Sequence, residues 1–85
     1  MDNDPPQNPS TDEAQTLDLR GLKCPLPALL TRRALERGAP GLRLTVECTD
    51  PMAVIDIPHM LHENGHTLEG QERQTDRLVF HIRKG

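Results

Sequence analysis

Apolar and polar residues alternate most clearly over residues 42–48, and this alternation predicts a β-strand. The apolar positions of this strand are Leu42, Leu44, Val46 and Cys48. Because side chains in a strand point alternately to opposite faces, these side chains should be buried together. Shorter runs predict three further strands, at residues 17–19, 68–73 and 78–82. A turn at Thr75-Asp76 would join the last two.

Two other stretches repeat their apolar residues at helical spacing. Residues 25–37 predict a first helix, which Gly38 ends. A second helix is expected after Asp50 as its cap, with Pro51 at the first helical position. Inside this second helix, Pro58 should cause a break or a kink, because proline lacks the N–H that the helix needs.

The predicted order of elements is βαβαββ, with no internal repeat. Each predicted element has one apolar side, and these sides are buried together when both helices cover one face of a single sheet. The sequence therefore predicts an α/β fold in which two helices pack on one face of the sheet. The first two strands should be parallel, because a helix crosses over between them.

Residues 1–14 differ in composition from the rest of the chain. They are rich in Pro and Asp, contain no Lys or Arg, and have almost no apolar side chain to bury. We expect them to be a disordered acidic tail before one domain at residues 15–85. The whole chain carries −3 and the tail −4, so the domain carries +1. With no Trp or Tyr for base stacking, this charge argues against direct binding of nucleic acid.

The two cysteines, Cys24 and Cys48, are too few for a disulfide scaffold. The sequence also shows no apolar segment typical of secretion or of membrane insertion. We therefore expect a cytoplasmic protein, monomeric and not inserted in a membrane. In a reducing compartment its thiols remain free to react.

One thiol lies where a strand ends and a helix begins, in the segment Gly21-Leu22-Lys23-Cys24-Pro25-Leu26-Pro27. Since Pro25 suits the first helical position, Cys24 is the expected N-cap residue, where the helix dipole favours a thiolate. Lys23 and Arg20 are the candidate cations that would stabilise this charge. The two prolines offer no N–H groups to the sulfur, so either the dipole and the lysine compensate or the lowering of the thiol pKa is modest.

These residues carry a resemblance to a known family. Leu17-Asp18 and the Cys24-Pro25-Leu26-Pro27 motif resemble the signature of the TusA/SirA-like sulfur-carrier proteins, a sulfurtransferase family. Further matching positions are Asp50-Pro51, Asp56-Ile57-Pro58, Gly65-His66 and Ile82-Arg83-Lys84-Gly85. The resemblance implies a two-layer fold with a mixed four-stranded sheet. It also implies that Cys24 is the catalytic cysteine and carries sulfane sulfur as a persulfide, with Gly21, Leu22, Pro25 and Pro27 forming the motif around it.

The same resemblance implies protein partners and no metal or organic cofactor. A cysteine desulfurase or another persulfide protein would be the donor, and a downstream protein would be the acceptor. The pathway could be tRNA thiolation, molybdenum cofactor synthesis or sulfur oxidation, which the motif does not distinguish. The surface near Cys24 and the arginines of the first helix is the candidate partner surface. These arginines, which also complement the helix dipole, are Arg32, Arg33 and Arg37.

Three other interpretations remain open, two for particular residues and one for the whole chain. Cys48 continues the buried face of its strand, yet it lies at the same sheet edge as Cys24, so a thiol redox pair is an alternative. His62 and His66 have the spacing of a zinc-binding pair, but Pro58 and the helix end favour a solvated face, or a helix-terminal role for His66. A non-catalytic interaction module is the third alternative.

Overall fold

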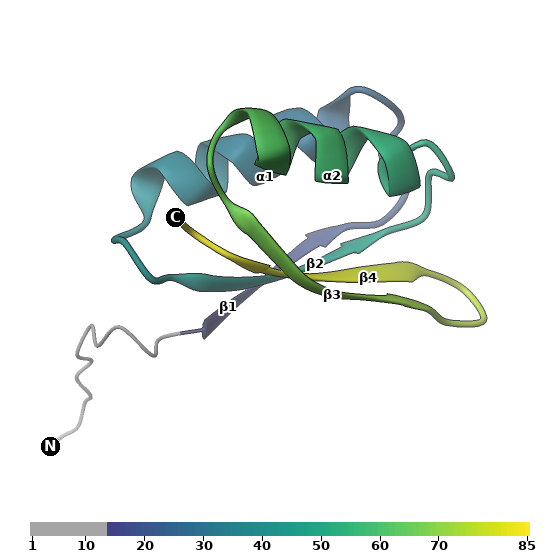
Figure 1. Ribbon diagram of the computed structural model, residues 1–85. Helices are drawn as coiled ribbons and strands as arrows, with labels where there is room; N and C mark the ends of the chain where they lie inside the picture. Colours follow the sequence, from purple (N-terminus) through teal and green to yellow (C-terminus); the bar gives the residue numbers. More distant parts are fainter. Residues whose placement is uncertain (1–13) are drawn as a thin grey trace, which may run out of the picture.

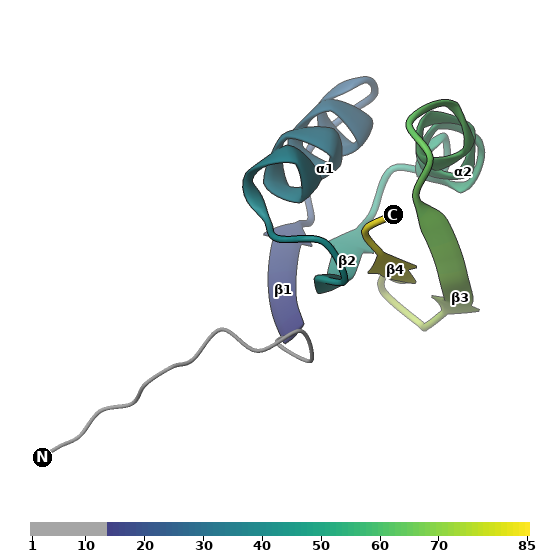
Figure 2. The same cartoon turned by 60° about the vertical axis from the view of Figure 1, so that its left-hand side comes forward.

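The computed structural model describes residues 14–85 and contains one mixed sheet covered by two helices. Its elements are β1 (Ala14–Leu19), α1 (Leu26–Arg37), β2 (Arg43–Cys48), α2 (Ala53–Glu63), β3 (Thr67–Arg73) and β4 (Leu78–Arg83). The strands lie in the order β1-β2-β4-β3, with β1 parallel to β2 and the other pairs antiparallel. Both helices lie on the same face of the sheet (Figures 1 and 2). The predicted βαβαββ fold is confirmed.

The core lies between the sheet and the helices. The two central strands, β2 and β4, contribute most of its sheet side, with Val46 opposite Phe80 in register. Both side chains are fully buried, and Phe80 is the only aromatic residue of the chain. Burying apolar surface stabilises the fold by about 25 cal/mol per Å². The apolar side chains of β2 thus face the core as predicted. Their burial holds β2 in place, and β2 in turn positions both β–α junctions.

Strand β1 is longer than its sequence pattern predicted. It begins at Ala14, which falls within the range expected to be tail, and it pairs residue by residue with β2 from Ala14 opposite Arg43 to Leu19 opposite Cys48. The first three residues of β1 are exposed, so backbone pairing rather than side-chain burial extends the strand. Residues 1–13, which were also expected to be disordered, lie outside the residues that the structure describes.

Helix α2 differs from its prediction at Pro58 and at its start. The helix continues through Pro58 without a break, and buried side chains on both sides of the proline, Ile57 and Met60, hold it on the sheet. Its cap is Met52 rather than Asp50. The Asp50 carboxylate instead accepts a hydrogen bond from the Met52 N–H at 3.1 Å. Pro58 still lacks the N–H for one helical hydrogen bond, and the burial of its neighbours offsets this loss.

Candidate functional site

Cys24 lies in the loop between β1 and α1, and its side chain is exposed. The N-cap of α1 is Pro25, so the prediction that Cys24 caps the helix is wrong by one residue. The reason is the local bonding. The Leu29 N–H donates to the Pro25 carbonyl at 3.1 Å, and the preceding turn is closed by the Leu26 N–H and the Lys23 carbonyl at 2.8 Å. Cys24 therefore lies in a turn just outside the helix.

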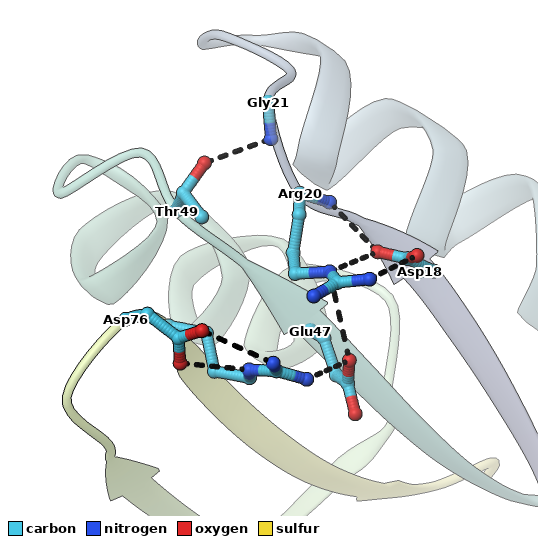
Figure 3. Close-up of polar contacts among 7 residues, drawn as sticks. Asp18, Arg20, Gly21, Glu47, Thr49 and Asp76 are labelled. Carbon is cyan, nitrogen blue, oxygen red and sulfur yellow. Dashed lines mark hydrogen bonds and ion pairs between the residues drawn. The ribbon is translucent and has the colours of Figure 1, made fainter.

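The loop after β2 holds the loop that contains Cys24. Since β1 and β2 are parallel, both loops leave the same edge of the sheet. The Asp50 carboxylate accepts hydrogen bonds from the Cys24 N–H and from the Met52 N–H. Thr49 Oγ1 accepts a hydrogen bond from the Gly21 N–H at 2.8 Å (Figure 3). Gly21 has a φ of +87°, which only glycine adopts without strain, so the loop conformation depends on this residue.

The side chain of Asp56, on the first turns of α2, contacts the reactive sulfur. Cys24 Sγ donates to Asp56 Oδ2 at 2.8 Å. This hydrogen bond, partial desolvation and the negative charges of Asp56 and Asp50 raise the pKa of the Cys24 thiol. A lowered pKa was expected from the helix dipole and nearby cations, and that expectation is wrong for the free chain. The direct contact with a carboxylate acts at shorter range than the dipole does.

The two cations expected to stabilise a thiolate act on carboxylates instead. The Arg20 side chain donates to both carboxylate oxygens of Asp18, at 2.9 and 3.0 Å, and lies 4.0 Å from Glu47 (Figure 3). Its hydrogen bonds lower the pKa of Asp18 to about 2. The positive charge of Lys23 contributes to a lowered pKa of Asp50, after the hydrogen bonds from Met52 and Cys24. Neither cation is thus assigned to the thiol.

Cys48 lies at the same edge of the sheet as Cys24, but its side chain is inside the core. It is the last residue of β2, fully buried and opposite Leu19. Burial raises the pKa of its thiol to about 11, with a smaller contribution from the charge of Asp50. Both cysteines are free thiols. The interpretation of Cys48 as a core residue is confirmed. Its burial argues against the alternative of a thiol redox pair with Cys24.

The surface around Cys24 exposes large apolar side chains from both helices. Their exposed fractions are 44% for Leu26, 49% for Leu29, 45% for Met52 and 61% for Ile55. On α1 a shallow hollow is lined by Leu26, Leu29, Leu30, Arg32, Arg33 and Glu36. The apolar residues at helical spacing on α1 are divided: Leu30 packs partly buried against the core, whereas Leu26 and Leu29 are exposed. The fully buried positions of α1 are Pro27, Thr31 and Leu35.

His59 and His66 each contact a group other than Cys24. His59 Nε2 is 3.4 Å from the Glu63 carboxylate, and His66 Nδ1 accepts a hydrogen bond from the Gly85 N–H at 3.1 Å. Partial burial lowers the pKa of His66, and the charge of Lys84 adds to this effect. Within residues 14–85 no three His, Cys, Asp or Glu side chains are grouped so as to hold a metal ion. In the same residues no helix has the length and apolar character needed to cross a membrane.

Sequence analysis missed the two carboxylates that face Cys24. Asp50 was assigned to a helix cap and to a motif that resembles the family, and Asp56 only to such a motif. The contact with Asp56 joins positions 32 residues apart, which no local pattern reveals. The family motif Asp56-Ile57-Pro58 was the one available signal that this residue has a special position.

The fold and the site define a small two-layer α/β domain with an exposed free thiol, and the comparisons with known proteins show its family. The family model described as Sulfurtransferase TusA matches residues 15–84. The chain is 38% identical over 69 residues to the sulfur carrier protein TusA of Pseudomonas entomophila, covering 81% of this chain and 86% of the relative. A crystal structure of a SirA-like protein from Desulfitobacterium hafniense has a TM-score of 0.72 and 26% identity, covering 84% and 97% of the two chains. This chain therefore belongs to the TusA family of sulfur carriers.

Proposed function

We propose that this chain is a sulfurtransferase that accepts sulfane sulfur as a persulfide on Cys24 and passes it to a downstream protein. The observation that carries this proposal is the exposed Cys24 thiol at the β1–α1 junction, beside a buried and inaccessible Cys48. Membership of the TusA family supports a role as a sulfur carrier. A cysteine desulfurase is the proposed donor.

The chemistry consists of two exchanges at one sulfur atom. In the first, Cys24 loses its proton and Sγ attacks the outer sulfur of the donor persulfide. The S–S bond of the donor breaks, and the donor leaves as a thiolate with the electron pair. In the second, an acceptor thiolate attacks the outer sulfur of the Cys24 persulfide, and Cys24 leaves as a thiolate. Each exchange breaks one S–S bond and forms another, so no external oxidant or reductant is required.

Docking of a protein partner must align the two sulfurs, and the exposed side chains near Cys24 are suited to it. Leu26 and Leu29 lie just after Cys24 on α1, and Met52 and Ile55 lie beside it at the start of α2. We propose that this apolar surface, together with the arginines of α1, contacts the donor and the acceptor. These arginines are Arg32, Arg33 and Arg37, of which Arg32 also pairs with Glu36 at 3.2 Å.

Intact-protein mass spectrometry tests the proposal. After incubation with a cysteine desulfurase and cysteine, we expect a gain of about 32 Da, the mass of one sulfur atom, on the wild-type chain. The Cys24→Ala variant should show no gain. The matched Cys48→Ala variant should still show it, because its changed side chain is buried in the core. A gain that survives the loss of Cys24, or no gain in any variant, would contradict the proposal.

A further inference from the structure

The charged groups around the Cys24 sulfur come from three elements. Asp56 on α2 accepts the Sγ–H at 2.8 Å, and Asp50 in the β2–α2 loop accepts the Cys24 N–H. In the β1–α1 loop Lys23 acts on Asp50, whereas Arg20 is bound to another carboxylate. The first turn of α1 carries no acidic side chain. Two carboxylates therefore lie near this sulfur, and the lysine acts on one of them, so the protonated form of the sulfur is favoured.

We propose that Asp56 is a positioning residue that holds Cys24 as a thiol in the free protein and so restricts sulfur exchange to docked partners. This inference rests on the proposed function. A thiolate is the nucleophile in these exchanges, and a thiol is not. Asp56 does not act as the base, because a carboxylate is a much weaker base than a thiolate and the shared proton stays on sulfur. Its effect on the free chain is to keep the sulfur unreactive.

The neighbouring side chains indicate what kind of partner releases the thiol. Met52 and Ile55 are exposed beside Asp56 on the same end of α2, so a protein that covers them also covers the carboxylate. A cationic side chain of that protein would neutralise Asp56 and lower the pKa of the thiol. The partner that fits is therefore a protein with an apolar contact surface and a Lys or Arg beside its own reactive sulfur. A small dissolved persulfide has no such group and would meet the protonated thiol.

The first test measures the alkylation rate of Cys24 by iodoacetamide between about pH 6 and pH 10 in the free protein. In Asp56→Asn, which keeps the shape of the side chain, we expect the midpoint of the pH profile to fall. For each unit of that fall the rate at pH 7 should rise about threefold, because a tenfold gain in thiolate is partly offset by lower nucleophilicity. The control, Glu63→Gln, removes a carboxylate from the far end of α2, where it pairs with His59, and should leave the profile unchanged.

The second test compares sulfur loading from a low-molecular-weight persulfide with loading from a cysteine desulfurase. In Asp56→Asn, loading from the small persulfide at pH 7 should rise by the same factor as alkylation, and loading from the docked donor should rise less. Asp56→Ala serves as a second neutral variant if Asp56→Asn does not fold, as judged by circular dichroism. An unchanged alkylation profile in the folded neutral variants would overturn the inference. If only the sulfur-carrier role is wrong, the profile still shifts but no variant gains sulfur mass.

Discussion

The two β–α junctions of the molecule lie at one edge of the sheet, and each contains a cysteine. Their strands are parallel and in register, with Leu19 at the end of β1 opposite Cys48 at the end of β2. Cys48 is still part of its strand and is fully buried, whereas Cys24 lies beyond its strand in an exposed loop. The difference shows that the position relative to the strand end, and not the residue type, separates an inert thiol from an accessible one.

The two junctions also differ in what they contribute to each other. The β1–α1 loop supplies the sulfur, and the β2–α2 loop and the first turn of α2 supply two carboxylates, Asp50 bound to the Cys24 N–H and Asp56 bound to Sγ. The site is therefore shared between segments far apart in the sequence. Accessibility and activation are separate properties here, because the exposed thiol is also the one that a carboxylate keeps protonated.

The largest expected effect is on the free energy of unfolding, and it separates the truncation of a buried apolar side chain from that of an exposed one. Phe80→Ala should lower the free energy of unfolding by about 3–5 kcal/mol, because it empties the centre of the core opposite Val46. Small domains are stable by only about 5–15 kcal/mol, so a large share of the stability is lost. Leu29→Ala, at an exposed position, should change it by less than about 0.5 kcal/mol while slowing donor-dependent loading. Urea denaturation measures both, and equal losses would contradict this division.

Sequence patterns predicted the fold well where burial decides the structure. Strand β2 followed from alternation because its side chains at positions 44, 46 and 48 are all in the core. The start of β1 was missed because Ala14 and its neighbours are exposed and held by pairing with β2, which leaves no periodic signal. Pro58 was expected to break or kink α2, and the helix is not broken there, because the packing of Ile57 and Met60 outweighs the missing hydrogen bond.

The site was predicted less completely, because its chemistry depends on long-range contacts. Cys24 was found from its local motif, and its exposure agrees with that interpretation. The direction of its pKa shift was wrong, since Asp56 comes from another helix and Arg20 is taken by Asp18. Local spacing identifies which residue can react. It does not show which charges surround that residue after folding.

The second prediction makes the same substitution at both cysteines. Cys48→Ser places a hydroxyl in the apolar core, and we expect it to cost about 1–3 kcal/mol of unfolding free energy. Cys24→Ser should leave the urea midpoint unchanged, because the side chain is exposed, yet it should abolish persulfide formation. Paired denaturation and mass measurements check both results. Equal midpoints for the two variants would show that the thiols do not differ in burial in solution.

The smallest expected effect concerns the charges on the outer face of the sheet, beside the loop of Cys24. Hydrogen bonds from Arg20 lower the pKa of Asp18 from 3.8 to about 2 in the folded state. Because the folded state has the lower pKa, the stabilisation is complete above pH 3.8 and is lost as the pH falls towards 2. Asp18→Asn should therefore lower the thermal midpoint slightly at pH 5 and have no effect near pH 2.

A matched variant tests whether the effect of Asp18 depends on its position beside the loop of Cys24. Asp76→Asn removes a carboxylate whose pKa is also lowered, in this case by hydrogen bonds from Arg77, and Arg77 binds Glu47 on β2 at 2.9 Å. The acid profile of Asp76→Asn should resemble that of Asp18→Asn. If the Arg20–Asp18 pair holds the loop of Cys24, the alkylation rate of Cys24 should change in Asp18→Asn and not in Asp76→Asn. A constant difference from wild type at every pH would contradict the titration argument. Added salt should shrink both effects, because exposed ion pairs are screened over about 10 Å at 0.1 M.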